Sequence, residues 1–328
     1  MSIIIEKAGW QTLVMDQGRK FTRHLGIPVS GVTDLFRYWW ANGLVGHSNF
    51  NNSGPPVLEM RSGPVEIIFE TAHRFALTGA GGEFSLDGVR IQSHKTWQAS
   101  PNQILRIGSI DRNGTVYLAI GGQWNVDRVY ESASADVLSP FPGTCGQMIK
   151  NNTRLEIIPG EKWSDQIKDS PEYIKPTSPA LENILRMTAG PELERIEAPK
   201  KSIIDEPFVI SRTSNRMAYR LETEKHPDFN QSSMISSAVL PGTLQWPVGG
   251  QPILLLPNCQ TTGGYPRIGR VIDADYWKLA YLGPGDSIRF KWVSRDEALY
   301  LRQYQMGQFT QAWNRTFDFP ITHHLLMY

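Results

Sequence analysis

The chain has 328 residues, with 33 basic and 32 acidic side chains and a formal net charge of +1. This length predicts two domains, and the balanced charge without a basic block excludes nucleic acid or an anionic membrane as a partner. No apolar run approaches the roughly 20 residues that span a bilayer, and the first ten residues lack the features of a secretory leader, so we expect a cytoplasmic protein. Two cysteines, Cys145 and Cys259, do not make a disulfide framework.

Short apolar runs bounded by turn residues recur along the chain and predict strands. These runs are residues 65–69, 74–78, 116–120, 155–158, 208–211, 253–256 and 287–293. Helical signals are fewer: Thr33 can cap a helix that stops at Gly46, residues 273–282 favour a short helix, and a capping box at Ser294 opens a helix to about Met306. Many strands and few helices indicate barrels or sandwiches.

A polar stretch at residues 160–180, with three prolines, separates two halves of the chain. We expect it to be a linker between an N-terminal domain, residues 1–165, and a C-terminal domain, residues 180–328. The pattern L-x-M-x-x-G-P occurs once on each side, beginning at Leu58 and at Leu185. Coincidence and a duplicated barrel both explain this repeat.

Two familiar kinds of site are not predicted. The glycine-rich residues 78–82 are not followed by Gly-Lys-Ser/Thr, so we expect a hairpin there and not a phosphate loop. His323 and His324 have no Cys or carboxylate at ligand spacing, which argues against a metal site. Cys259 has no histidine near it in sequence and is expected to be a small core thiol.

A polar loop follows the predicted strand at residues 253–256 and is the strongest candidate for a binding site. It carries an amide, two hydroxyls, two glycines and a phenol in succession: Gln260, Thr261, Thr262, Gly263, Gly264 and Tyr265. A simple reversal of the chain needs about two turn residues. Paired glycines allow close approach of either a ligand or another backbone.

Charged residues near loop glycines form a second constellation, made of Asp16, Arg19 and Asp34. These side chains can form a structural ion pair that pins a loop, or they can clamp a carboxylate or carboxamide with the planar fork of the arginine. Asn215 and Arg216 present the same two alternatives.

Several motifs, in a constant order along the chain, resemble those of one family. The motifs are DQGR (16–19), GVTD (31–34), SNRMAYRL (214–221), LPGTLQWP (240–247), GQPI (250–253) and QTTGGYPRI (260–268). They resemble the family of the 5-oxoprolinase C subunit, also called KipA-like or allophanate hydrolase subunit 2. This family is similar to the carboxyltransferase half of urea carboxylase.

The resemblance implies a mainly β fold with two cyclophilin-like β-barrel domains and a few short helices. It implies one component of an ATP-dependent 5-oxoprolinase, which acts on a small cyclic amide together with a KipI-like and a LamB/YcsF-like protein, ATP being bound at or with the partner. By the same resemblance the motifs meet in one cleft. We therefore expect catalytic roles for Asn258, Asp34 and Arg216, and substrate contacts from Arg19, Asn215, Gln260, Thr261, Thr262, Gly263, Gly264 and Tyr265.

The chain departs from the family pattern at positions that bear on activity. Asn258 stands where relatives usually carry Asp, and an amide cannot take up a proton at neutral pH. Ser237 replaces the usual His or Glu, and Glu131 replaces the first glycine of a G-S-x-S-T-D motif. Two alternatives therefore stay open. One is carboxyl transfer between carboxybiotin, carried by another protein, and urea or a related amide. The other, which these departures favour, is a KipA-like regulatory partner of a KipI-like protein.

Overall fold

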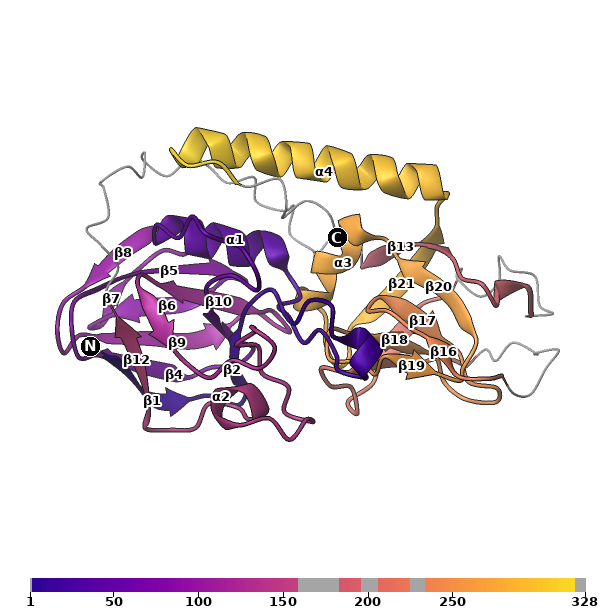
Figure 1. Cartoon of the computed structure of the whole chain (residues 1–328), viewed down its shortest axis with the longest axis horizontal. Coiled ribbons are helices and arrows are strands. Elements are labelled where there is room, and N and C mark those ends of the chain that lie inside the picture. Colours follow the sequence, from indigo (N-terminus) through magenta and orange to yellow (C-terminus); the bar gives the residue numbers. More distant parts are fainter. Residues whose placement is uncertain (1, 159–182, 196–205, 225–233, 322–328) are drawn as a thin grey trace. The chain divides into compact units, whose positions relative to one another are not determined.

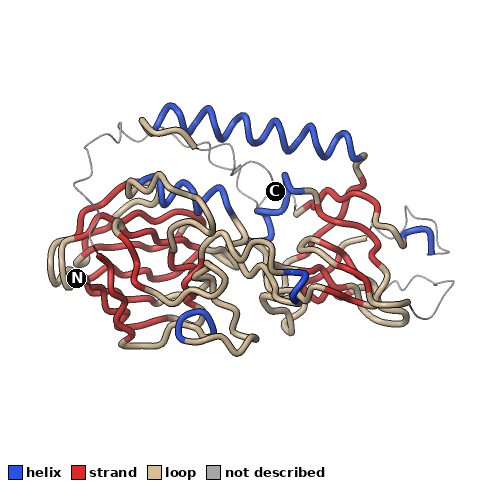
Figure 2. The backbone as a smooth tube through the Cα atoms, in the orientation of Figure 1, coloured by secondary structure: helices blue, strands red, loops and turns tan. Residues whose placement is uncertain are grey.

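The computed structural model describes residues 2–158, 183–195, 206–224 and 234–321, and β-strands dominate it (Figure 2). The predicted mainly β fold class is confirmed, and each predicted strand segment coincides with a strand of the structure. The chain divides into two compact units. The first contains residues 1–20, 30–175 and 308–328, and the second contains residues 21–29 and 176–307. The predicted linker at residues 160–180 lies outside the described residues.

The first unit is built from two antiparallel sheets. The seven-stranded sheet has the order β11 (Gln123–Asn125), β12 (Thr153–Ile158), β1 (Ser2–Ala8), β4 (Val65–Phe69), β9 (Ile104–Ile110), β6 (Gly82–Leu86) and β7 (Val89–Arg90). The five-stranded sheet has the order β2 (Thr12–Met15), β3 (Val57–Met60), β10 (Val116–Ile120), β5 (His73–Gly79) and β8 (Thr96–Ala99). In β4 buried and half-buried residues alternate, as expected for a strand with one face in the core.

Helix α1 (Leu35–Leu44) packs on strands β5 and β10 of the first unit (Figure 1). The prediction that Thr33 caps it is wrong by one residue: Asp34 is the N-cap, and its Oδ1 accepts from the backbone N–H of Arg37 at 3.1 Å. A carboxylate also complements the positive end of the helix dipole, which a threonine cannot do. The predicted stop is confirmed, because Gly46 follows the helix with φ 88°.

The glycine-rich residues 78–82 do not form the predicted hairpin. They lead from β5 in the five-stranded sheet to β6 in the seven-stranded sheet, so the two strands are not partners. Gly79 has φ 102°, and a Cβ there would lie 2.2 Å from the carbonyl oxygen of Thr115. Only glycine permits this close crossing of backbones. The hairpin of this region joins β6 to β7 through Asp87 and Gly88, both with positive φ.

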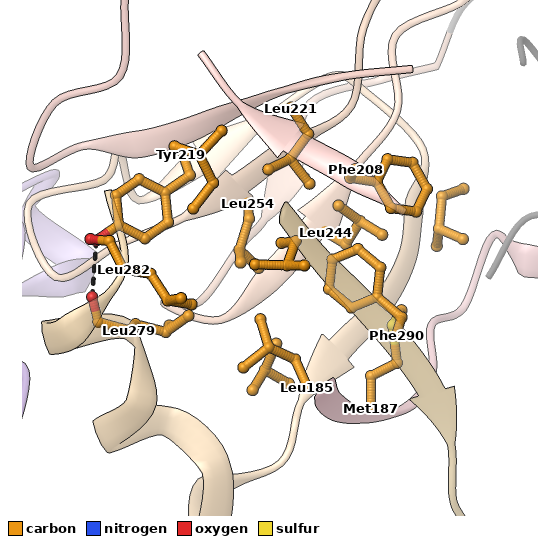
Figure 3. Close-up of a cluster of buried hydrophobic side chains, with 14 of the residues drawn as sticks. Leu185, Met187, Phe208, Tyr219, Leu221, Leu244, Leu254, Leu279, Leu282 and Phe290 are labelled. Carbon is orange, nitrogen blue, oxygen red and sulfur yellow. Dashed lines mark hydrogen bonds between the residues drawn. The ribbon is translucent and has the colours of Figure 1, made fainter. Parts of the chain in front are cut away.

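The second unit contains a closed barrel. Its strand order is β13 (Ile184–Ala189), β20 (Arg267–Val271), β17 (Thr243–Gln245), β18 (Ile253–Leu255), β15 (Ala218–Glu222), β14 (Phe208–Ile210) and β21 (Ser287–Trp292). Leucine and aromatic side chains from all sides fill its interior (Figure 3). Two short strands, β16 (Ser237–Ala238) and β19 (Thr262–Gly263), form a separate pair beside it. The unit also contains two 3₁₀ turns, η1 (Arg23–Leu25) and η3 (Leu193–Arg195).

A buried ion pair fixes the short helix α3 (Asp273–Tyr276), which continues into the 3₁₀ turn η4 (Trp277–Tyr281) as the sequence predicts. Asp275 is fully buried, and Arg186 of β13 donates to it from the backbone N–H, Nε and Nη2 at 2.8, 2.9 and 2.6 Å. Lys278 adds a contact of 3.0 Å. Burial alone raises the pKa of Asp275, but Arg186 and Lys278 outweigh it and lower that pKa below its ordinary value.

Helix α4 (Arg295–Thr316) begins at the predicted capping box, where the Ser294 hydroxyl accepts from the Glu297 backbone N–H at 3.0 Å. The predicted end near Met306 is wrong, since the helix continues for ten residues beyond it. The extension buries Phe309 and Trp313 in the first unit, where Trp313 packs edge-on against Trp40 with ring centroids 6.1 Å apart. This aromatic packing overrides the local signal of Gly307, which usually ends a helix. Within the part of the chain that the structure describes, no helix is long and apolar enough to cross a bilayer.

The two aspartates of α3 allow a matched test of the buried pair. We expect Asp275→Asn to lower the free energy of unfolding by about 3–5 kcal/mol at pH 7, because Arg186 loses the charge that compensates its own burial. Asp273→Asn, at a partly exposed contact of 2.8 Å with Arg270, should cost about 1 kcal/mol or less. Urea denaturation of both variants gives the comparison.

The same pair predicts a pH dependence. The pKa of Asp275 is lower in the folded protein than in the unfolded chain. Its stabilisation is therefore complete above the ordinary pKa of about 4 and is lost as the pH falls through the folded value. The difference between wild type and Asp275→Asn should shrink below about pH 4. An equal difference at pH 7 and pH 3 would contradict this assignment.

Candidate functional site

Asn258 and Arg216, both predicted from the sequence to be catalytic, lie in direct contact in the second unit. Asn258 follows β18 and is 4% exposed. Arg216 Nε donates to Asn258 Oδ1 at 3.1 Å, and the backbone N–H of Asn258 donates to the Arg216 carbonyl at 3.3 Å. The Arg216 guanidinium and the Asn258 amide are thus held together just beyond the end of strand β18. The barrel sheet fixes the backbone of that strand.

Asn215, predicted to bind substrate, has a local structural role. Its Oδ1 accepts from the backbone N–H groups of Met217 and Ala218 at 2.8 and 3.4 Å. This is an Asx-type turn that leads the chain into β15. Asn215 therefore sets the position of Arg216 next to it, and its contact with a substrate stays a prediction.

The predicted binding loop, residues 260–265, is organised around a buried glutamine that the sequence analysis did not single out. Gln245 is 0% exposed. Its Oε1 lies 3.5 Å from Gln260 Nε2, and Gln245 Nε2 donates to the Tyr265 carbonyl at 3.2 Å. A Cβ on Gly263 would lie 2.7 Å from Gln245 Nε2, so glycine is needed there for the loop to close on this amide. Gly263, one glycine of the pair, thus allows close contact with a side chain of the protein and not with a ligand.

The remaining loop residues differ in exposure. Thr261 is half-buried, and its carbonyl accepts from the Val239 N–H at 3.0 Å. Thr262, in β19, is exposed, Gly264 is half-buried, and Tyr265 is 48% exposed. The hydroxyl of Thr262 and the phenol of Tyr265 are therefore on the part of the loop that solvent reaches.

Arg23 was also missed, because it lies outside every motif of the sequence. It belongs to η1 (Arg23–Leu25) in the second unit, and its guanidinium donates to the carbonyls of Val239 and Gln260, the latter at 3.4 Å. Beyond the loop, Arg267 forms a bidentate pair with Glu192 at 2.8 and 2.7 Å, which lowers the pKa of Glu192. Two cations therefore hold the loop at its start and just after its end.

Asp16, in the first unit, is a buried structural carboxylate. It accepts from the hydroxyls of Ser132 and Ser134 at 2.6 and 2.7 Å, and from the backbone N–H groups of Ala133 and Gly18 at 2.6 and 2.8 Å. Burial raises its pKa, and these neutral donors oppose that shift only in part. The carboxylate ties the DQGR turn to residues 132–134 through neutral donors, and not through the ion pair with Arg19 that the structural alternative expected.

Arg19 is fully buried in the first unit and incompletely paired. Nη2 donates to the Ser134 carbonyl at 2.6 Å, and the guanidinium lies 4.6 Å from the centroid of the Phe141 ring. Nε and Nη1 have no hydrogen-bond partner among the described residues. Burial lowers the pKa of Arg19, while Cys145 and nearby carboxylates raise it. Arg19 and Asp34 are described with the first unit and the loop with the second, so a shared cleft stays a prediction.

Both cysteines are buried, and burial raises the pKa of each thiol, consistent with a core role for Cys259. Among the described residues no three His, Cys, Asp or Glu side chains gather as metal ligands would. His323 and His324 lie outside the described residues.

The polar loop lies beside a β-barrel, and the comparison of the whole chain with known proteins agrees with the resemblance of its motifs. Residues 25–292 match the family model described as carboxyltransferase domain, subdomain A and B. The chain belongs to this family. Among its relatives, the C subunit of 5-oxoprolinase from Escherichia coli K12 is 35% identical over 311 residues, which cover 94% of this chain and 97% of the relative.

More distant relatives are parts of longer proteins. Urea amidolyase of Saccharomyces cerevisiae is 26% identical over 93% of this chain, which spans 17% of that protein. The crystal structure of the K. lactis urea amidolyase superposes with a TM-score of 0.81 over 95% of this chain, at 23% identity and over 20% of that protein. At this identity the superposition shows a common fold.

Glu131, at the position where the resemblance leads us to expect glycine, adopts a backbone conformation that favours glycine. Its φ is 64°, and Tyr130 before it has φ 49°. A left-handed conformation costs a residue with a Cβ about 1–2 kcal/mol, while glycine costs about 0.5–1 kcal/mol in chain entropy. We therefore expect Glu131→Gly to raise the free energy of unfolding by up to about 1 kcal/mol in urea denaturation.

Glu83, an exposed residue of β6, provides the matched control. Glu83→Gly should destabilise the protein by about 0.5–1 kcal/mol, because it adds chain entropy and relieves no strain. Equal destabilisation by the two substitutions would show that backbone strain at Glu131 is not significant.

Proposed function

We propose that this chain is one component of an ATP-dependent 5-oxoprolinase and acts together with a KipI-like and a LamB/YcsF-like partner protein. The observation that carries the proposal is the similarity to the 5-oxoprolinase C subunit of E. coli over nearly the full length of both chains. The polar loop, Arg216 and Asn258 supply the groups that a small cyclic amide needs: donors for its carbonyl oxygen and acceptors for its N–H.

The low reactivity of the lactam carbonyl explains why the proposed reaction needs ATP and partner proteins. An unstrained lactam carbonyl is a poor electrophile until its oxygen is phosphorylated. In the described residues the glycine-rich segment 78–82 leads into a strand and not into a helix, so it does not provide a phosphate-binding helix N-terminus. We therefore assign ATP to the partner, and this chain to binding and orienting the amide.

Within the second unit, Arg216 and Asn258 act together in this proposal. Arg216 holds the Asn258 amide through Nε. We place the substrate carbonyl beside the positive charge of this arginine. A cation and amide donors stabilise negative charge that develops on the carbonyl oxygen as the ring opens. The loop hydroxyls of Thr261 and Thr262, with the Tyr265 phenol, orient the substrate by hydrogen bonds.

Carboxyl transfer is the second candidate, and the similarity to urea amidolyase supports it. The same loop can bind urea, since urea and 5-oxoproline share an amide. In that case carboxybiotin is delivered by a separate carrier protein. Neighbouring genes for KipI-like and LamB/YcsF-like proteins favour the oxoprolinase, and a neighbouring biotin carboxylase gene favours transfer. A regulatory role, favoured by Asn258, is the outcome if the assembled complex has no activity.

The proposal predicts activity only in the assembled complex. Purified with both partners, the chain should support ATP hydrolysis that depends on 5-oxoproline and forms glutamate, measured as coupled release of phosphate and glutamate. The isolated chain should show neither, since the ATP-binding part is absent. Full turnover by the isolated chain contradicts the need for a partner, and transfer from carboxybiotin by a complex that ignores 5-oxoproline contradicts the assigned reaction.

Asn258→Asp tests whether this position transfers a proton. If it does, the new carboxylate should raise kcat of the complex by about 10²–10⁴, the usual size of general-base catalysis. Arg216 Nε, 3.1 Å from the Asn258 oxygen, should lower the pKa of the introduced carboxyl, so the variant should lose rate only below about pH 4. Asn102→Asp, on an exposed turn of the first unit, adds the same charge elsewhere as a control. An unchanged rate and pH profile, with ligand binding intact, would place proton transfer on the partner.

A further inference from the structure

Among the residues that the structure describes, the hydroxyl group of Tyr276 is buried and has no hydrogen-bond partner. Tyr276 is the last residue of α3, and its side chain is partly exposed as a whole, but the hydroxyl oxygen is shielded from solvent and finds no partner. Nearly all buried tyrosine hydroxyls are hydrogen-bonded, because an unpaired polar group inside a protein is costly. This exception needs an explanation.

The ring of Tyr276 lies near the end of β18, the strand that leads to Asn258. Its ring lies against Gly242, where an added Cβ would be 3.4 Å from Cδ2, and the Gly242 N–H donates to Leu255 at the end of β18. Arg216 and Arg270 act electrostatically to lower the pKa of the phenol, and Cys259, the neighbour of Asn258 in sequence, acts to raise it. All of these residues belong to the second unit.

The hydroxyl is held in place by the backbone that carries it. Asp275, the preceding residue, receives three hydrogen bonds from Arg186, and the Ile272 N–H donates to the Arg186 carbonyl at 2.9 Å. Helix α3 is therefore fixed to strand β13 on both sides of its short length. The backbone of Tyr276 is thus fixed, as is needed for a donor that faces developing negative charge.

The phenol stays protonated over the physiological range. Burial raises the pKa of Tyr276 above its ordinary value, and the two nearby arginines do not cancel this effect. The group can thus donate a hydrogen bond but cannot act as a base at neutral pH.

We propose that Tyr276 is a carbonyl-binding residue, whose phenol donates a hydrogen bond to the carbonyl oxygen of a small amide that binds beside Arg216 and Asn258. The inference rests on the proposed function and extends it to a residue outside every motif of the sequence. The phenol keeps its proton throughout, so it polarises the carbonyl and no bond of the tyrosine is made or broken. The bound amide supplies the partner that the protein does not.

Tyr219 provides a matched control within the same barrel. It is 2% exposed, and its hydroxyl shares a hydrogen bond between the carbonyl oxygens of Leu279 and Leu282, 2.7 and 2.6 Å away (Figure 3). Its hydroxyl is thus used entirely in holding the end of η4 to β15. Removing the two hydroxyls one at a time should therefore give opposite results.

The experiment compares Tyr276→Phe and Tyr219→Phe in the full chain and in the complex with its partners. Tyr276→Phe should raise the urea midpoint of unfolding or leave it unchanged, because it removes an unpaired buried group. It should lower kcat/KM for 5-oxoproline by about 10²–10³, the usual loss for one donor to a developing oxyanion. Tyr219→Phe should lower the urea midpoint and keep kcat/KM within about twofold of wild type.

Calorimetric binding of 5-oxoproline and of urea to the same proteins separates this inference from the proposed function. Weaker binding of either amide by Tyr276→Phe supports the role of Tyr276, even if the wild-type complex does not turn over 5-oxoproline and the proposed reaction fails. If Tyr276→Phe binds and turns over the amide like wild type, the carbonyl-binding role is overturned while the proposed reaction stands. Wild-type protein that binds neither amide overturns both.

Discussion

The barrel of the second unit depends on the carboxylate of Asp275, which lies inside the protein and is held by Arg186 and Lys278. Burying a carboxylate is tolerable only when charge and hydrogen bonds replace water, and here a bidentate arginine and a lysine do so. The interaction fixes α3 against β13. Because Tyr276 follows Asp275 directly, the same carboxylate sets the position of the backbone that carries the Tyr276 side chain.

The first unit buries a carboxylate by a different means. Asp16 is surrounded by two serine hydroxyls and two backbone N–H groups, and its ion pair with Arg128 is long, at 3.7 Å. These neutral donors only partly offset the rise in pKa that burial causes, so the pKa of Asp16 is raised. The pKa of Asp275, by contrast, is lowered. The two aspartates therefore differ in character. Asp275 stays ionised because cations face it, and Asp16 is the carboxylate whose ionisation depends on the serines of residues 132–134.

Local signals in the sequence predicted the elements that are set by neighbouring residues. They failed for features that are set by contacts between residues far apart in the sequence. Strands such as Val65–Phe69 and Val116–Ile120 could be predicted because their apolar runs are bounded by turn residues. The end of α4 could not, since Trp313 continues the helix only by packing on Trp40. In the candidate site, the loop at residues 260–265 and the Arg216–Asn258 region followed from motifs. Gln245 and Arg23 act through contacts 15 or more positions away in the sequence, and nothing in the letters around Tyr276 shows that its hydroxyl lacks a partner.

The aromatic end of α4 has a consequence for the order in which the protein is made. Phe309 and Trp313 complete the core around Trp40, and Gly43 lacks the Cβ that would otherwise lie 2.7 Å from Trp313. These two segments of one core are separated by the whole of the barrel in the sequence. On the ribosome, the aromatic core of the first unit therefore stays incomplete until Phe309 and Trp313 emerge, after the whole barrel has been made. A chain that ends early, even just before residue 308, releases a protein with this tryptophan surface exposed, and quality control can recognise such incomplete chains by it.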